Sequence, residues 1–194
     1  VPPTSANVEK YYQQGYRSFL FADYEKAVLM YGGYLKNKPD DDFVWYSLAE
    51  SYLRLGQIQK AVEAYEKAIA LNPSKALYHK GLAVAYNYLD QNHKVIDCAE
   101  KARKLGKDDS ILNTLLGKSL INQQNFTEAV QVLEKALEQN CNNLLAKFQL
   151  AIAYMKTGQV DLAVNHLQEI SRSPVKTPIK MEAQALLNKL QRTA

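Results

Sequence analysis

The sequence predicts an all-α protein, a solenoid of five helix-turn-helix repeats closed by a C-terminal capping helix. Three observations lead to this prediction. Small and bulky apolar residues return every 34 residues from Val8 onward, without an insertion. Within each period the apolar residues recur at the spacing of one helix face. The chain also has only 8 Gly and 6 Pro among its 194 residues, too few for a loop-rich β protein.

The period is visible when equivalent positions are compared. Gly56 and Gly158 are three periods apart, and each follows a helical pattern at the same place. Small residues fill the eighth place throughout: Gly15, Ala49, Ala83, Gly117, Ala151 and Ala185. Small residues let two helix backbones approach closely, and bulky residues between them fill the grooves. The period divides the chain into a flexible segment, five repeats and a capping helix, with the bounds 1–7, 8–41, 42–75, 76–109, 110–143, 144–177 and 178–194.

The first repeat is unusually aromatic. Its first helix carries Tyr11, Tyr12, Tyr16, Phe19 and Phe21. These are too many for a free outer face, so we expect either missing residues or another molecule to cover them. Gly32-Gly33 lies inside the second helix, where each Gly costs ~1 kcal/mol relative to Ala. Either tolerated drift in a terminal repeat or the close approach of another backbone would account for this pair.

The second repeat shows why a hairpin is expected. Its two apolar faces are marked by Trp45, Leu48, Ala49 and Tyr52 and, beyond a turn at Gly56, by Ile58, Val62, Tyr65 and Ile69. Asn72-Pro73 then ends the second helix, because the residue before a proline avoids the helical region. Such a hairpin cannot bury its apolar face alone, so neighbouring repeats must stack.

The later repeats keep the pattern with substitutions. The third and fourth depart from the second at His79, Asp90, Lys107, Asn113 and Cys141. After the fifth repeat, Thr177 and Pro178 predict the N-cap and the first residue of a final helix. Apolar residues along that helix would cover the last exposed face of the array.

These residues resemble the tetratricopeptide repeat (TPR) family. The second repeat matches the family's W-x2-L-G-x2-Y, A-x3-F and P pattern through Trp45, Leu48, Ala49, Tyr52, Gly56, Ala61, Tyr65, Ala68 and Pro73. The resemblance covers about residues 8–177, with five repeats in register. It implies a right-handed superhelix of repeats, a non-enzymatic scaffold or adaptor that binds proteins, and a concave groove lined by the first helix of each repeat.

The resemblance also implies which residues face that groove, because certain places of the first helix are exposed in the family. We expect a protein or peptide partner to be bound by Tyr12, Tyr16, Phe43, Tyr46, Glu50, Arg54, Lys80, Asn87, Tyr88, Lys118, Asn122, Phe148 and Lys156. Tyr and Arg are typical interface anchors. Lys118, Asn122 and Lys156 suit a carboxylate or an acidic side chain. The alternative for any single Tyr is that it packs beneath the neighbouring repeat.

The sequence contains no catalytic, metal or cofactor motif, and we expect neither enzyme activity nor a cofactor. The three His lie in two repeats, His79 and His93 in the third and His166 in the fifth, and none belongs to an HExxH motif. Cys98 and Cys141 do not form a disulfide framework, which favours a reducing compartment such as the cytoplasm. A formal net charge of +4 is too balanced to indicate a nucleic-acid partner.

The two ends of the chain carry no clear targeting or membrane signal. The start, "VPPTSANVEK", shows neither a signal peptide nor an initiator Met, so we expect a cut or processed product. No apolar run approaches the ~18 residues of a membrane helix. Basic residues around 101–107 and 176–192 suit solvated helix faces, or a weak peripheral contact with an anionic membrane.

Three functions remain open. The first is a scaffold that holds a partner peptide in the groove. The second is a self-assembling coat or organelle scaffold that forms homo-oligomers through its N-terminal repeat. The patterns "YYQQGYRS", "ADYEKAV" and "AIAYMKTGQVD" favour it, since they are similar to those of magnetosome-associated bacterial TPR scaffolds. The third is a regulatory domain of a larger protein.

Overall fold

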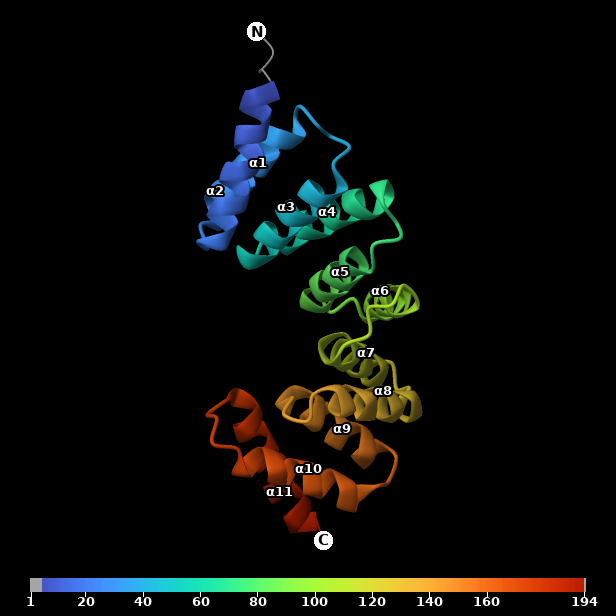
Figure 1. Cartoon of the computed structure of the whole chain (residues 1–194). Helices are drawn as coiled ribbons and strands as arrows, with labels where there is room; N and C mark the ends of the chain where they lie inside the picture. The colour runs from blue at the N-terminus through green and yellow to red at the C-terminus, as the bar shows by residue number, and fades with distance from the viewer. Residues whose placement is uncertain (1–4, 194) are drawn as a thin grey trace. The chain divides into compact units, whose positions relative to one another are not determined.

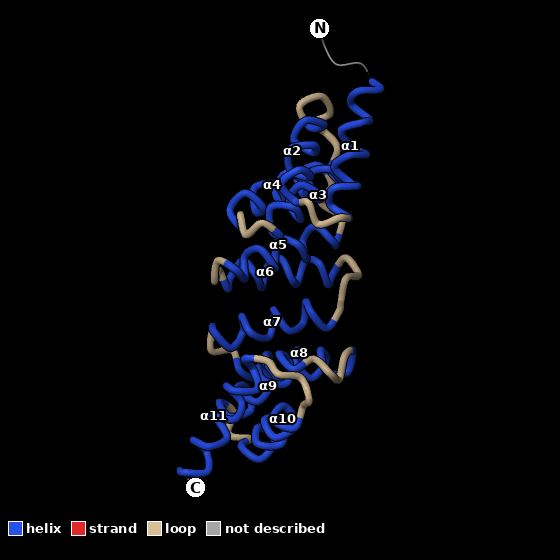
Figure 2. Tube along the Cα trace, turned by 90° about the vertical axis from the view of Figure 1, so that its left-hand side faces the viewer, coloured by secondary structure: helices blue, strands red, loops and turns tan. Residues whose placement is uncertain are grey.

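The computed structural model describes residues 5–193, and within them every element is a helix (Figures 1 and 2). Within the compact parts of the chain, consecutive helices pack against each other and are joined by short connections. Their bounds are α1 (Ser5–Leu20), α2 (Tyr24–Leu35), α3 (Asp42–Arg54), α4 (Ile58–Leu71), α5 (Ala76–Tyr88), α6 (Asn92–Lys104), α7 (Ser110–Asn122), α8 (Phe126–Gln139), α9 (Leu144–Lys156), α10 (Val160–Arg172) and α11 (Pro178–Thr193).

The helix starts follow the sequence period closely. The helices α3, α5, α7 and α9 begin at the first residue of the second to fifth repeats, and α11 begins at Pro178. The first helix differs, because α1 begins at Ser5 and not at Val8. Residues 5–7 are therefore helical and not part of a flexible segment, since no Pro or Gly between Ser5 and Val8 interrupts the helix. The rest of that predicted segment, residues 1–4, lies outside the described residues.

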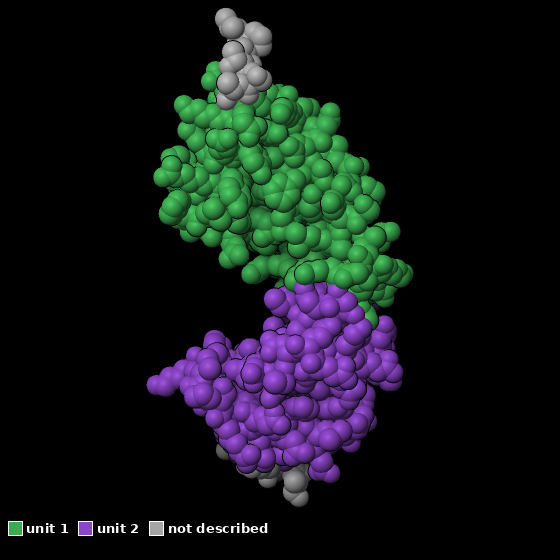
Figure 3. Space-filling model, in the orientation of Figure 1, with its two compact units in different colours: residues 1–107 green, residues 108–194 purple. Residues whose placement is uncertain are grey.

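The chain divides into two compact units, Val1–Lys107 and Asp108–Ala194 (Figure 3). Unit 1 contains α1 to α6, and unit 2 contains α7 to α11. The division falls in the connection after α6, where Gly106 has a φ of +89°. Each unit has its own buried core, and each is described by itself.

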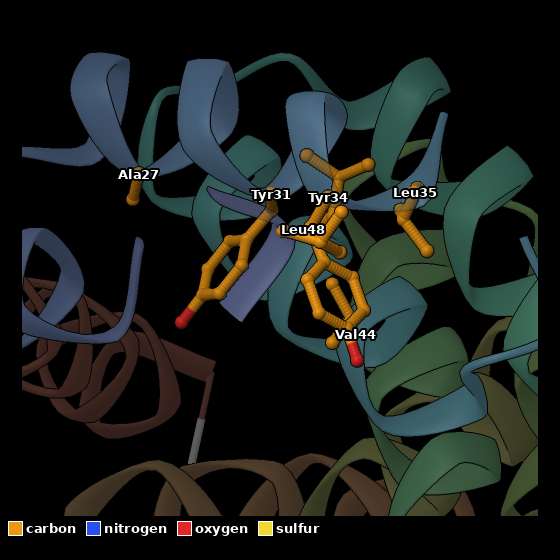
Figure 4. Packing of buried hydrophobic residues seen from close by; sticks show 7 residues of the cluster. Ala27, Tyr31, Tyr34, Leu35, Val44 and Leu48 are labelled. Carbon is orange, nitrogen blue, oxygen red and sulfur yellow. The ribbon is translucent and has the colours of Figure 1, made fainter. Parts of the chain in front are cut away.

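The core of unit 1 is rich in tyrosine. Tyr31 and Tyr34 project from α2, with Tyr34 beside Val44 of α3 (Figure 4). The ring of Tyr31 is almost fully buried and fits because α1 has Gly15 opposite it. A Cβ at Gly15 would lie 2.7 Å from Cδ1 of Tyr31, closer than van der Waals contact permits. The small residue at the eighth place thus makes room for a large ring between two helices.

Unit 2 uses leucine where unit 1 uses tyrosine. Leu133 of α8 is fully buried, and a Cβ at Gly117 of α7 would lie 2.4 Å from its Cγ. The last helix, α11, packs against α10 and α9 and buries Ala183 and Leu187. Pro178 occupies its first position, as expected from the fixed φ of proline. This helix therefore covers an apolar face of unit 2.

The turn inside each hairpin takes a left-handed residue at the same repeat place. The five φ values are +59° at Ala22, +71° at Gly56, +52° at Asp90, +63° at Gln124 and +81° at Gly158. The next backbone N–H then returns to the first helix of the hairpin; that of Gln57, for example, donates to the carbonyl of Tyr52 at 2.9 Å. Only glycine adopts this conformation without steric cost, so three of the five turns are strained.

The two central glycines of α2 differ from each other. A Cβ at Gly32 would meet nothing within 4 Å, whereas a Cβ at Gly33 would lie 2.9 Å from the ring of Tyr11 on α1. The close approach at Gly33 therefore comes from a side chain of the same hairpin. Neither another backbone nor a preceding helix is needed to explain Gly33, and Gly32 faces open space.

Candidate partner-binding surface

Aromatic rings gather around Tyr46 on unit 1. Its ring stacks on that of Tyr78 from α5, with centroids 5.1 Å apart and planes 25° apart. It also meets the rings of Tyr65 from α4 at 6.0 Å and Phe43 from α3 at 6.1 Å. Such offset and tilted contacts are favoured by the charge distribution of aromatic rings. We name these four residues, Phe43, Tyr46, Tyr65 and Tyr78, the tyrosine cluster.

Tyr65 reaches this cluster from the second helix of its hairpin. Its side chain is fully buried, and its hydroxyl donates a hydrogen bond to Glu50 on α3. The ring passes close to α5, where a Cβ at Gly81 would lie 2.4 Å from Cε1 of Tyr65. Gly81 thus provides the space through which Tyr65 extends from α4 to the carboxylate on α3.

The hydroxyls of the cluster are held as hydrogen-bond donors. Burial raises the pKa of Tyr46 and Tyr65, the charge of Glu50 and hydrogen bonds to it raise both further, and Arg54 opposes the shift. Burial and a 2.8 Å hydrogen bond to Asp42 likewise raise the pKa of Tyr78. These phenols stay protonated at neutral pH, and their donation to carboxylates fixes the orientation of the rings.

A second group of tyrosines lies on the first hairpin. The ring of Tyr12 stacks on Tyr16 at 6.5 Å and meets Tyr34 at 5.7 Å. The Tyr34 hydroxyl donates to Asp41 at 2.8 Å. Burial, together with this bond, raises the pKa of Tyr34 to about 12. Burial, followed by the charges of Asp41, Tyr16 and Glu9, also raises the pKa of Tyr12. Two of the predicted groove residues, Tyr12 and Tyr16, are therefore in contact.

The other residues predicted for the groove in unit 1 are less closely associated. Arg54 is exposed at the last turn of α3, and Tyr88 is 64% exposed at the end of α5. Lys80 and Asn87 are half-buried and make interactions within the chain. The structure thus brings Phe43, Tyr46, Glu50 and Arg54 together on α3, and places Lys80, Asn87 and Tyr88 on α5.

The four predicted residues of unit 2 do not share one environment. Asn122 and Lys156 are exposed and Lys118 is half-buried. Phe148 is only 8% exposed, so it contributes to the core of unit 2 and is a poor anchor for a partner. The repeat place of Phe148 is the same as that of Tyr46, but its surroundings cover it.

A further apolar position lies on the first helices of the repeats and was not predicted as a contact. The second place of the last four repeats holds a large apolar residue, and all of these are exposed: Phe43, Leu77, Ile111 and Leu145. Only Phe43, 45% exposed, was predicted as a contact. The repetition of an apolar residue at one exposed place was visible in the sequence and would have identified the other three.

His79 and Cys98, two residues of types that often act in catalysis, have structural roles here. His79 is buried, with Nε2 2.9 Å from the carbonyl oxygen of Pro73. Burial raises the pKa of the Cys98 thiol to about 12, which makes it unreactive at neutral pH. Across residues 5–193, no three His, Cys, Asp or Glu side chains come together as metal ligands. Within the same range, no helix is both long and apolar enough to cross a membrane.

Comparison with known families agrees with the hairpin geometry. Two family models described as tetratricopeptide repeat match residues 43–75 and 120–190, together more than half of the chain. The chain belongs to the TPR family. TPR proteins are generally non-catalytic protein-interaction modules, and the predicted all-α TPR fold is confirmed.

Solved structures with the same fold include several TPR proteins. A MamA protein superposes with a TM-score of 0.77 at 19% identity, covering 90% of this chain and 99% of that one. MamA from Desulfovibrio magneticus, from residue 41 to its end, gives a TM-score of 0.77 at 15% identity, covering 84% and 92%. YrrB, described as a TPR protein with an unusual peptide-binding site, gives 0.78 at 16%, covering 90% of each chain. No curated protein sequence matches this chain.

Proposed function

We propose that this TPR protein is a non-enzymatic scaffold or adaptor that binds a segment of a partner protein on the first-helix face of its repeats. The observation that carries the proposal is the tyrosine cluster of α3, α4 and α5. It combines accessible aromatic surface on Phe43 and Tyr46 with hydroxyls that are fixed by Glu50 and Asp42. Arg54 is exposed at the C-terminal end of α3.

The physical basis is preorganisation. Tyr and Arg provide large contact areas, and they are enriched among residues that dominate interface energies. Rings that are already stacked and hydrogen-bonded lose little conformational freedom when a partner binds. Exposed apolar side chains at the second repeat place, such as Leu77 beside this cluster on α5, extend the surface in a form suited to an extended peptide. A peptide-binding site is described for the structurally similar protein YrrB.

Affinity capture from a native lysate tests this proposal. Wild type is compared with Tyr46→Ala combined with Arg54→Glu, and with a control, Glu63→Ala combined with Lys67→Glu, on exposed positions of α4. Circular dichroism checks that both variants keep their helix content. We expect a partner to be retained by wild type and control and lost by the cluster variant. Equal capture by all three proteins would show that recognition lies elsewhere on the chain.

A second candidate is self-assembly through the first hairpin. Phe21 and Leu29 are 75% and 68% exposed there. A hollow of about 500 Å³ on the same hairpin is lined by Tyr11, Val28, Leu29, Met30, Gly32, Gly33, Lys36 and Asn37. Large exposed apolar side chains of this kind favour burial against another chain. Light scattering over a range of protein concentrations tests this candidate. A molar mass that stays that of a monomer would argue against self-assembly. An oligomer mass that is unchanged by Leu29→Lys would argue against assembly through this hairpin.

Two other expectations stay predictions. One is a regulatory role within a larger protein. The other is a weak peripheral contact with an anionic membrane, for which Lys176, Val175 and Met181 are exposed around the start of α11 and Lys189 is exposed further along it.

A further inference from the structure

We infer that the tyrosine cluster recognises the positively charged side chain of an arginine, so that the partner segment it takes is basic. This inference rests on the proposed function, because it names the chemistry of the segment that the same surface would bind. Three features of unit 1 carry it: the order of side chains along α3, the hydrogen bonding of two carboxylates, and the partly exposed rings of Phe43 and Tyr46.

The first feature is a stripe along α3. Asp42, Tyr46, Glu50 and Arg54 follow one another at four-residue spacing, which places them on one side of the helix. Successive members are about 6 Å apart along the axis. Tyr46 therefore has a carboxylate one turn before it and another one turn after it. Arg54 lies beyond Glu50, so the favourable position for a partner's cation is over Tyr46, on its Asp42 side.

The second feature is that both carboxylates are fixed yet retain acceptor capacity. Glu50 accepts from the hydroxyl of Tyr65, and its charge also acts on Tyr46. One oxygen of Asp42 accepts from the Tyr78 hydroxyl at 2.8 Å and from the amide of Asn72 at 3.1 Å. A carboxylate has about four lone-pair positions, so these bonds orient each group without filling it. Arginine offers five N–H donors in a plane and accepts nothing, which matches such a site.

The third feature is the aromatic surface itself. Phe43 is 45% exposed, and the half-buried ring of Tyr46 lies beside it, stacked on the buried ring of Tyr78. The face of an aromatic ring attracts a cation within about 6 Å of its centroid. The chain makes such contacts elsewhere: Lys94 Nζ lies 4.8 Å from the ring centroid of Tyr86, and Lys38 Nζ lies 5.5 Å from that of Tyr34. A guanidinium also stacks on aromatic rings, which favours arginine.

The charge around the neighbouring tyrosines has the same sign. Asp42 and Asp41 both act on Tyr78, and Asp41 and Glu9 both act on Tyr12 and Tyr34. An acidic surface of this kind increases the association rate of a basic segment and disfavours an acidic one. The aromatic faces supply contact area, and the carboxylates decide which charge is accepted.

Three synthetic peptides of one length test the inference: acetyl-Leu-Arg-Ala-Arg-Leu-amide, the same peptide with citrulline for both arginines, and the same peptide with glutamate. Citrulline keeps the shape of arginine and removes its charge. Each peptide is titrated into the isotope-labelled full chain while the backbone amide resonances of Tyr46 and Tyr78 are followed by NMR. We expect saturable shifts with the arginine peptide and at least about fivefold weaker binding of the citrulline peptide, as for the loss of a partly exposed charge-assisted contact.

Two conservative variants and one control locate the effect. Asp42→Asn and Glu50→Gln keep the side-chain size and should each reduce the arginine preference about threefold or more. Glu63→Gln, at an exposed position of α4, should leave the preference unchanged. Equal loss in all three variants would indicate long-range charge alone and would overturn the assignment to this cluster.

The remaining outcomes separate this inference from the proposed function. Equal binding of the arginine and citrulline peptides at Tyr46 would overturn charge recognition while leaving peptide binding intact. Tighter binding of the glutamate peptide would overturn it as well, as would unshifted Tyr46 and Tyr78 resonances at millimolar arginine peptide. The scaffold function itself is decided separately, by whether the lysate partner is lost with the Tyr46 and Arg54 variant.

Discussion

Replacing Gly81 with Ala should destabilise the protein, although the same change usually strengthens a helix. In a helix interior, Ala is more favourable than Gly by about 1 kcal/mol. At Gly81, however, the new Cβ would lie 2.4 Å from Cε1, 2.7 Å from Cζ and 2.9 Å from the hydroxyl oxygen of Tyr65. The ring is fully buried and its hydroxyl is bound to Glu50, so it cannot move without losing that bond.

The net effect follows from two opposing contributions. Inserting a methyl group into a filled core costs about 1 to 3 kcal/mol, and losing the hydrogen bond to a carboxylate adds about 1.5 kcal/mol or more. Subtracting the helix gain of about 1 kcal/mol leaves a destabilisation of about 2 kcal/mol. For a chain of this length, that destabilisation corresponds to a thermal unfolding midpoint lowered by roughly 4 to 8 °C. Thermal and urea unfolding followed by circular dichroism measure it.

Two further substitutions test whether the clash with Tyr65 causes this destabilisation. Gly32→Ala meets nothing within 4 Å and should stabilise the chain by about 1 kcal/mol. In a Tyr65→Leu background the obstructing ring atoms are absent, so Gly81→Ala should become stabilising there. A Gly81→Ala protein that is as stable as Gly32→Ala in the wild-type background would refute the close packing of Tyr65 against α5. An unchanged cost in the Tyr65→Leu background would refute it equally.

Three further predictions follow from backbone strain and from ionisation. Gln124→Gly should stabilise the chain by about 1 kcal/mol in urea unfolding, because residue 124 has a φ of +63°, and an unchanged midpoint would contradict the strain. Burial lowers the pKa of His166 below 6.5, so the unfolded state binds the proton first and stability should fall as the pH drops below about 6.5. This acid loss should shrink in His166→Gln when unfolding is compared at pH 7.5 and pH 5.5, and an equal loss in both proteins would assign it to other groups. Burial and a bond to Glu134 raise the pKa of Tyr154 to about 12, so the stability that its hydroxyl contributes is present below pH 10 and lost as the pH approaches 12. The advantage of wild type over Tyr154→Phe should therefore disappear in alkaline unfolding, and an advantage that persists would exclude this ionisation.

Most of the fold could be predicted because the 34-residue period marks where each helix begins and where helices pack. A small residue at one place and a bulky one at another must recur wherever two helices pack in the same way, so helix starts such as Asp42 and Ala76 follow from the sequence. The start of α1 did not follow, because no period precedes it. The role of Gly33 was also outside the pattern, since its neighbour Tyr11 belongs to the side-chain packing of one hairpin.

The binding surface could be predicted only in part. Tyr46, Glu50 and Arg54 were expected from their repeat places, and the structure groups them on α3. Tyr65 was assigned only to packing, because nothing in its own repeat shows that Gly81 of the next one leaves a path to Glu50. Phe148 was wrong as an exposed anchor, since exposure depends on the surrounding side chains as well as on the repeat place. Thr114, at the same place in the preceding repeat, is also buried.

The side chain of Tyr65 connects α4 to the surface proposed for binding. Its backbone belongs to α4, its ring fills the space beside α5, and its hydroxyl ends on α3. Opening either the second or the third hairpin would therefore release the carboxylate that orients Tyr46. By thermodynamic linkage, a ligand held by Glu50 stabilises both hairpins against local opening, so amide hydrogen exchange should slow in α4 as well as in α3 and α5, whose side chains form the surface. Occupancy of the surface would then be recorded in the exchange rates of α4, whose one residue in the cluster, Tyr65, is fully buried.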